Sequence, residues 1–343
     1  MKTLNNKELR EIIQSGHINL LIGSGCSLPY LSTLIDIEKL MNEESTREQA
    51  QKEYYQIIRK SKAVIDDSLE TNVDEKAKLI TVRKNYDDFI GFWTEAISTR
   101  SLNIINKQVN LFTTNFDMFV EDACERLNVP YNDGFAGQLK PKFSVGNFNK
   151  IQKYKSLQFD NTSDIPLFNI VKLHGSLSWQ TKDSDVVYSD GSHISDNLDT
   201  KSGEEFNIDY QSQLAVINPN AEKHFETVMD TNYASMLRKF TLELEKENSV
   251  LFVFGFSLAD KHIKDLLYNV MKSNPTLVVI YIAHSPYDEI IDDKEEAKNT
   301  NLYIIAPKTG SKIPFNEATV RMRKVLFSEE DKPESHEDNE EQL

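Results

Sequence analysis

The stretch Leu111-Phe112-Thr113-Thr114-Asn115-Phe116-Asp117 joins large apolar residues to a cluster of short polar ones. Such a join is typical of a buried strand that ends at the surface of a site. The stretch Lys172-Leu-His174-Gly-Ser176 repeats this arrangement, with an imidazole after the apolar run. The two stretches together predict a ligand site at the ends of neighbouring strands.

Apolar strands and amphipathic helices alternate along the chain. We expect strands at 18–25, 109–115, 169–174, 214–217, 250–255, 277–283 and 302–306, and helices at 119–127, 232–246, 260–271 and 317–326. Near-continuous runs of Val, Ile, Leu and Phe in the strands indicate burial on both faces. The predicted fold class is therefore α/β, a Rossmann-like parallel sheet flanked by helices. Ligands of such sheets bind beyond the carboxyl ends of the strands.

Two insertions interrupt this pattern within one predicted domain of residues 1–328. A highly charged helical insertion at about 38–100 follows the first strand, and it serves either as an assembly surface or as cover for the sheet. An irregular, polar insertion spans about 132–215. Residues 329–343 are acidic and almost without apolar side chains, so we expect a disordered tail.

The composition is that of a globular protein. The chain has 343 residues, 39% of them hydrophobic, which suffices for a core without disulfides or metal. No stretch approaches the ~20 apolar residues of a membrane helix, and no signal-peptide pattern is present, so we expect a cytoplasmic protein. Cys26 and Cys124 are interpreted as small reduced side chains rather than reactive thiols. We find no metal-ligand spacing and expect no metal.

Acidic residues dominate the chain, whose formal net charge is −15. The tail accounts for −7 of this charge and leaves −8 on the body. A negative body disfavours direct nucleic-acid binding. Backbone N–H groups and helix dipoles would have to hold an anionic cofactor.

A glycine-rich turn follows the first strand and comprises Gly23, Ser24, Gly25, Cys26 and Ser27. Glycines in such a turn let a pyrophosphate approach the backbone, although an ordinary strand-to-helix turn has a similar composition. The sequence Ser27-Leu28-Pro29 predicts that a helix opens here, since serine caps helices and proline suits their first turn.

The polar strand ends allow both functional and structural interpretations. The side chains of Thr113, Thr114, Asn115 and Asp117 would bind a ribose and a carboxamide, or Asn115 or Asp117 would cap the following helix. His174 is a candidate base, and a structural histidine is the alternative.

A second glycine turn, Gly255-Phe-Ser257, follows the strand at 250–255. Ser257 is placed to meet a ribose or a phosphate. Asp260 is expected to cap the next helix, and His262, in its first turn, is assigned no chemistry. The two tryptophans, Trp93 and Trp179, are expected to be packing residues.

Taken in order, these motifs resemble those of the sirtuin superfamily. That family has a Gly-Ala-Gly-x-Ser turn and a Thr-Gln-Asn-Ile-Asp strand end, where this chain has Gly23 to Ser27 and Thr113 to Asp117. The family then has His-Gly and Gly-Thr-Ser-Leu, where this chain has His174-Gly175 and Gly255-Phe-Ser-Leu258. The motif sequences of this chain are closer to those of the bacterial sirtuin-like branch found in anti-phage systems. That branch shows Thr-Thr-Asn-Tyr/Phe-Asp, Gly-Phe-x-Gly, Lys-Leu-His-Gly-Ser and Gly-Tyr/Phe-Ser-x-x-Asp-x-His-Ile, and Gly134-Phe-Ala-Gly137 and Gly255 through Ile263 are similar to the second and last patterns.

Two departures separate the chain from the sirtuin deacylases. The deacylases carry a four-cysteine zinc module, which two cysteines cannot build. Thr114 stands where they have Gln, and no Arg follows the glycine turn. Both departures fit the defence branch, whose members look like NAD hydrolases.

The resemblance implies roles for the matching residues. Asn115 would orient the nicotinamide ribose and the attacking water, and His174 would act as the base. Asp117 would hold the carboxamide, the Gly23 to Ser27 turn the pyrophosphate, and Ser257, after Gly255, the adenosine side.

The resemblance also implies a function. We expect an NAD+ hydrolase effector of anti-phage defence that releases nicotinamide and ADP-ribose, with NAD+ as substrate. Its activity would be gated by homo-oligomerisation or by a partner such as a HerA-type ATPase or a short Argonaute. A sirtuin-type protein deacylase or ADP-ribosyltransferase, and a non-catalytic sensor of NAD or ADP-ribose, are the alternatives.

Overall fold

The computed structural model describes residues 5–100, 105–158, 160–182, 185–203, 205–206, 210, 216, 231–258, 260–285, 301–308 and 310–327. Most of the strand predicted at 214–217 and the whole acidic tail at 329–343 lie outside these residues.

One parallel sheet organises the chain. Within the described residues seven strands form it, in the order β13-β12-β11-β1-β2-β8-β3, and every pairing is parallel. The strands are β1 (His17–Ile22), β2 (Gln108–Thr113), β3 (Tyr131–Asn132), β8 (Leu167–Lys172), β11 (Ser249–Phe254), β12 (Val278–Ile282) and β13 (Leu302–Ile305). The predicted Rossmann-like α/β fold is confirmed. The strand order reverses between β1 and β11, which is where such sheets bind ligands.

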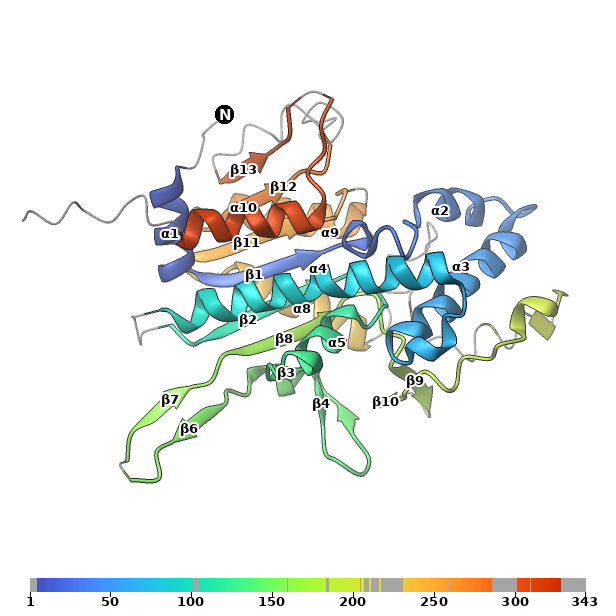
Figure 1. Cartoon of the computed structure of the whole chain (residues 1–343), viewed down its shortest axis with the longest axis horizontal. Helices are drawn as coiled ribbons and strands as arrows, with labels where there is room; N and C mark the ends of the chain where they lie inside the picture. The colour runs from blue at the N-terminus through green and yellow to red at the C-terminus, as the bar shows by residue number, and fades with distance from the viewer. Residues whose placement is uncertain are drawn as a thin grey trace, which may run out of the picture.

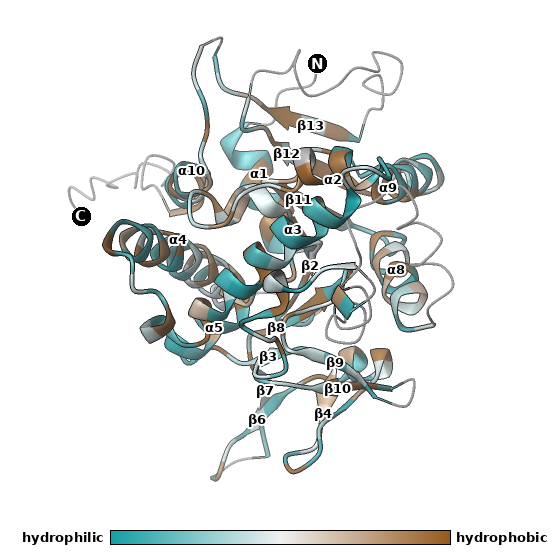
Figure 2. Ribbon diagram, turned by 90° about the vertical axis from the view of Figure 1, so that its right-hand side faces the viewer, coloured by the Kyte–Doolittle hydropathy of each residue, from teal (hydrophilic) through white to brown (hydrophobic). Residues whose placement is uncertain are grey.

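Helices cover both faces of this sheet (Figure 2). Helices α1 (Asn6–Ser15), α4 (Val73–Ser98), α5 (Phe119–Arg126) and α10 (Phe315–Phe327) lie on one side, and α8 (Thr231–Leu244) and α9 (Lys261–Ser273) lie on the other. Strand residues alternate between the two cores: Leu20 and Ile22 of β1 pack with the first layer, and Leu21 packs with the second. The alternation explains why the strands are apolar at almost every position.

The insertion after β1 is helical, as predicted, and its parts have different places. Helix α4 packs its buried residues, among them Phe89 and Trp93, onto the sheet. Helices α2 (Ile35–Met41) and α3 (Arg47–Ser61) lie beyond the carboxyl ends of the strands (Figure 1), where Tyr54 and Ile58 form a separate apolar cluster with Phe116. The insertion therefore covers the sheet with α4 and the strand ends with α2 and α3.

The irregular insertion holds short strands and turns. Those described are β4 (Phe135–Ala136), β5 (Lys142–Phe143), β6 (Lys153–Lys155), β7 (Thr162–Asp164), β9 (Trp179–Lys182) and β10 (Asp185–Tyr188). Short 3₁₀ helices are η1 (Ser24–Ser27), η2 (Lys62–Val64), η3 (Asp67–Leu69), η4 (Val145–Asn149) and η5 (Leu198–Thr200). Both tryptophans are buried, which confirms their predicted packing role. In the part of the chain described, none of the helices has the length and apolar character needed to cross a bilayer.

Candidate functional site

The four motif loops lie side by side at one edge of the sheet. Strands β11, β1, β2 and β8 are consecutive in it, and one motif loop follows each of them. Leu173 N donates to Thr113 O at 2.8 Å, and Leu177 N donates to Phe116 O at 2.9 Å, so the loops after β2 and β8 run together. The loops therefore converge as the sequence predicts.

The two glycine turns pack directly on each other. Gly23 N donates to Phe254 O at 3.0 Å, and Gly25 N donates to Gly255 O at 2.9 Å. A Cβ on Gly23 would lie 2.5 Å from Gly255 O, and Gly255 itself has a φ of +55°. Close backbone contact therefore requires these glycines. Because three of the turn's N–H groups, those of Gly23, Gly25 and Cys26, donate within the protein, the predicted pyrophosphate contact would have to use other donors.

The prediction that a helix begins at Ser27-Leu28-Pro29 is wrong. Residues Ser24–Ser27 form the 3₁₀ turn η1, and the next helix begins at Ile35. Leu28 is extended, with φ −72° and ψ 145°, because the proline ring disfavours a helical conformation in the residue before it. Between the glycine turn and Ile35 the described backbone contains no α-helix.

A buried hydrogen-bond network joins the glycine turn to the loop after β2. Ser27 Oγ donates to Asp117 Oδ2 at 2.8 Å and lies 3.0 Å from Tyr86 Oη. Asn115 Nδ2 donates to Gly23 O at 3.1 Å and lies 3.4 Å from Ser27 Oγ. The sequence did not point to Tyr86, because in the sequence it is one more apolar position of a long helix. Its fully buried hydroxyl has a role only once α4 is packed.

The side-chain amide of Asn115 has an oxygen that accepts no hydrogen bond from the described residues. Its Nδ2 must face the Gly23 carbonyl, because a flipped amide would bring two acceptors together. Its Oδ1 is buried, and within the described part of the chain no hydrogen-bond donor reaches it. A buried acceptor without a partner is costly, so this oxygen is suited to a hydroxyl or water that arrives with a ligand.

The carboxyl group of Asp117 is buried and held on both oxygens. Oδ1 accepts from Phe119 N at 3.3 Å, at the start of α5, and Oδ2 accepts from Ser27. Burial raises the pKa of Asp117, and the nearby Lys172 ammonium opposes the rise. Lys172 Nζ also donates to Asp117 O and lies 3.1 Å from Glu121 Oε1. The N-cap residue of α5 is Met118, so neither Asn115 nor Asp117 caps this helix by position, although the Asp117 carboxylate accepts from its first N–H and also orders the glycine turn.

His174 lies in a cluster with two residues of the loop and helix after β11. Its Nε2 is 3.2 Å from His262 Nε2 and 3.4 Å from Asp260 Oδ2, and His262 Nδ1 is 2.5 Å from Asp260 Oδ1. Asp260 is the N-cap residue of α9 by position, but its side chain makes no capping hydrogen bond. The predicted capping role of the Asp260 side chain is therefore wrong, and its carboxylate lies against the two imidazoles instead. His262, to which no chemistry was assigned from the sequence, lies beside the candidate base.

The other predicted residues differ in access. Thr113 is buried, its hydroxyl donating to Ile22 O at 2.9 Å and accepting from Asn115 N, so it supports the loop. Cys26 is buried, and burial raises the pKa of its thiol, as expected of an inert cysteine. The more accessible members of the predicted set are Ser24, Gly25, Thr114 and Gly255, which are half-buried, and Ser257, which is exposed.

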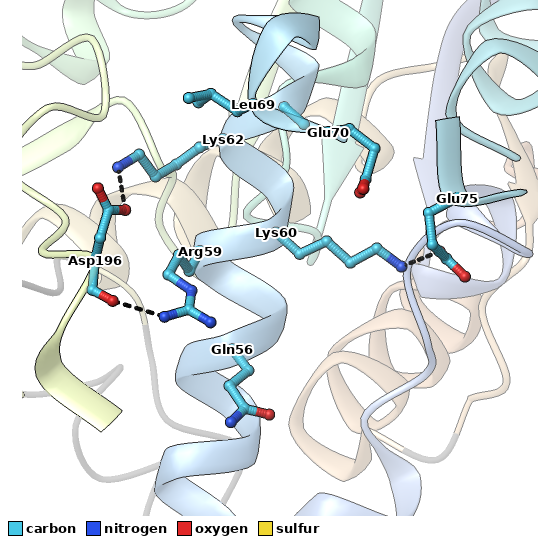
Figure 3. Close-up of a pocket in the computed structure, with 9 residues that line it drawn as sticks. Gln56, Arg59, Lys60, Lys62, Leu69, Glu70, Glu75 and Asp196 are labelled. Atoms are coloured by element: carbon cyan, nitrogen blue, oxygen red, sulfur yellow. Dashed lines mark hydrogen bonds and ion pairs between the residues drawn. The ribbon is translucent and has the colours of Figure 1, made fainter. Parts of the chain in front are cut away.

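A cavity of about 730 Å³ lies elsewhere, along α3 (Figure 3). None of the motif residues lines it. Its Lys60 pairs with Glu75, and Lys62 Nζ lies 2.9 Å from Asp196 Oδ1. Because these ammonium groups are already neutralised, the cavity is poorly suited to an anionic nucleotide.

A solved structure described as "Structural Basis for the Mechanism and Regulation of Sir2 Enzymes" is 14% identical to the chain, over 94% of this chain and 96% of that one, with a TM-score of 0.40. A search of curated proteins found no match. The SIR2-like domain family matches residues 109–305, which include Asn115, His174 and the loop after β11. The chain therefore belongs to the SIR2-like domain family and has the NAD-dependent type of function of the sirtuins.

Proposed function

We propose that the protein is an NAD+ hydrolase that releases nicotinamide and ADP-ribose. The observation that carries this proposal is the buried Oδ1 of Asn115, which reaches no donor within the described residues and lies on the loop beside that of His174. A ribose hydroxyl or the attacking water would supply the missing donor.

The chemistry suits these residues. The bond between ribose and a cationic nicotinamide breaks through an oxocarbenium-like state, and nicotinamide leaves neutral, so no strong acid is needed. Asn115 would position the ribose and the water, and His174 would accept a proton from the water or the ribose hydroxyl. Correct positioning alone lowers such a barrier by several kcal/mol. The alternative sirtuin reactions need a second substrate, which is either an acylated lysine or an acceptor of ADP-ribose. No feature of the described site supports the binding of such a substrate.

The burial of the site supports control of this activity. Asn115 is 6% exposed, and the His174 side chain is 13% exposed, beneath the strand ends that α2 and α3 cover. We infer that assembly of the chain with itself or with a partner opens or completes the site. The motif resemblance makes anti-phage defence the proposed context, and a HerA-type ATPase or a short Argonaute the proposed partner.

NAD+ consumption by the purified chain tests the hydrolase. The variants Asn115→Ala and His174→Ala should each lower the rate about 10²–10³-fold, as removal of one preorganised catalytic group does. The controls Gln152→Ala and His193→Ala, which lie outside the site, should keep it. Nicotinamide release that requires an acylated peptide would indicate a deacylase instead, and tight NAD+ binding without turnover, alone and with candidate partners, would indicate a sensor.

Concentration dependence tests the gating. The rate per chain should rise with protein concentration, or on addition of the partner, in parallel with the mass measured by light scattering. A constant rate from a monomer would contradict gating by assembly while leaving the hydrolase proposal intact.

A further inference from the structure

Three side chains with metal-ligating atoms meet at the candidate site: those of His174, Asp260 and His262. One ligand atom from each residue lies within 4.8 Å of those of the other two. The side chains are only 13%, 9% and 5% exposed, so they are held in a largely dry environment. They come from two separate parts of the chain, the loop after β8 and the start of α9.

The carboxylate of Asp260 contacts both imidazoles. Its Oδ1 lies 2.5 Å from His262 Nδ1, and its Oδ2 lies 3.4 Å from His174 Nε2. Imidazole nitrogens and carboxylate oxygens are ligands that divalent transition-metal ions accept.

The two imidazole rings also bring a nitrogen of each close together. His174 Nε2 is 3.2 Å from His262 Nε2 and 3.4 Å from Asp260 Oδ2. A tetrahedral ion with bonds of about 2.0–2.1 Å holds its ligand atoms about 3.3 Å apart. The two spacings from His174 Nε2 thus match edges of a coordination tetrahedron, and one ligand atom from each of the three residues lies within 4.8 Å of the others.

We propose that His174, Asp260 and His262 bind one divalent transition-metal ion of the Zn²⁺ type. Two imidazoles and a carboxylate form a ligand set that suits Zn²⁺ and Co²⁺ and leaves one position for water or another ligand. The site is unrelated to a cysteine cluster, since both cysteines are buried away from it in the core. It also differs from the sequence expectation that no metal binds, because Asp260-x-His262 becomes a ligand pair only when His174 joins it.

The site has a regulatory consequence, which rests on the proposed NAD+ hydrolase. A metal ion on His174 Nε2 occupies a lone pair of the candidate base and fixes its ring. Zn²⁺ should therefore inhibit NAD+ hydrolysis, and a chelator should restore it. Metal binding itself does not depend on the hydrolase proposal.

Titration of the chelator-treated full chain with Co²⁺ tests the site. We expect one Co²⁺ per chain with a visible d–d absorption band, displaced by Zn²⁺, and a rise in the melting temperature with Zn²⁺. His262→Ala and Asp260→Asn should lose the band and the rise, and the matched control His193→Ala should keep both. His174→Gln, which changes a different part of the chain, provides the same test if either α9 variant fails to fold.

Two results would overturn the metal site: no band and no Zn²⁺-dependent melting shift in the wild-type chain, or a band that persists in all three ligand variants. The two histidines would then share a proton. If the metal binds and the metal-free chain hydrolyses no NAD+, with or without candidate partners, the hydrolase proposal fails and the metal site stands.

Discussion

The hydroxyl group of Tyr86, in the middle of α4, lies 3.0 Å from Oγ of Ser27 in the glycine turn after β1. Ser27 donates its single proton to Asp117, so the Tyr86 hydroxyl must donate to Ser27. Burial, followed by the charge of Asp117, raises the pKa of Tyr86, which keeps this donor protonated. The helical insertion is thus connected directly to the candidate site.

Tyr86→Phe should weaken both stability and activity. The ring keeps its stacking on Phe119, whose centroid is 5.1 Å away, while Ser27 loses a donor. Loss of one such hydrogen bond costs about 1 kcal/mol of unfolding free energy, and the loosened turn should lower the rate of NAD+ hydrolysis. Urea unfolding and NAD+ consumption measure the two effects, with the exposed Tyr154→Phe as control. Equal values for Tyr86→Phe and Tyr154→Phe would contradict the network.

Gly255→Ala should destabilise the protein, whereas Gly91→Ala should not. A Cβ on Gly255 would lie 2.6 Å from Cys26 N, at a φ of +55° that L residues rarely adopt, so we expect a loss of more than about 1 kcal/mol. Gly91 lies inside α4 with nothing within 4 Å of its added Cβ, so alanine there should stabilise by roughly 0.5–1 kcal/mol. Thermal unfolding should shift in opposite directions. A shift of the same sign in both variants would show that the contact between the two turns is not what requires Gly255.

Asn110→Leu should be strongly destabilising. Asn110 Nδ2 donates to Asn19 Oδ1 at 2.9 Å, and Asn110 Oδ1 accepts from Asn169 Nδ2 at 2.9 Å, across three adjacent strands. Asn110 Nδ2 also lies 3.1 Å from the buried Glu243 Oε2, so leucine would deprive three buried groups of a partner, at a cost of roughly 2–4 kcal/mol. Chemical denaturation measures the cost, and Gln152→Leu on the surface is the control. A cost for Asn110→Leu below about 1 kcal/mol would show that the ladder contributes little.

Asp117→Asn should change how stability depends on pH. Burial raises the folded-state pKa of Asp117 above its ordinary 3.8, so ionisation of this group opposes folding. Its contribution is fully present below pH 3.8 and is lost as pH rises through the folded pKa. The stability of the wild type relative to Asp117→Asn should therefore fall as the pH rises from below 3.8 towards neutrality.

Urea unfolding of the two proteins across that range measures the difference. The matched variant Asp66→Asn changes an exposed aspartate whose pKa is lowered by Ser68, so its difference from the wild type should move in the opposite direction. A difference between the wild type and Asp117→Asn that does not vary with pH would contradict a raised pKa.

Local patterns were sufficient for most of the strands. β11 and β12 begin and end within one residue of their predicted limits, because a run such as that at 250–254 is apolar at every position and stops at a glycine. The helix after β1 failed because a capping serine and a proline also occur in turns, and Leu28 had to be extended before Pro29.

Side-chain partners across long separations were not readable from such patterns. Asp260 had the sequence context of a cap, and only the approach of His174 gives its carboxylate another role. That approach brings the start of α9 to the loop after β8, although β11 and β8 are three strand spacings of about 4.8 Å apart in the sheet. The residues that flank Asp260 and His174 in the sequence do not indicate that these two side chains come together.

The sequence alone determined the parallel α/β sheet and the presence of a polar or glycine-rich loop after β11, β1, β2 and β8, because hydrophobic runs and their breaks are local properties of the chain. The tertiary structure decided which contacts those loops make with one another. The contact of Gly23 with Gly255, the hydrogen bond from Tyr86 to Ser27 and the meeting of His174 with His262 depend on how crossovers and insertions pack. Packing places atoms from distant segments within a few ångströms, and no periodicity in the sequence encodes those distances.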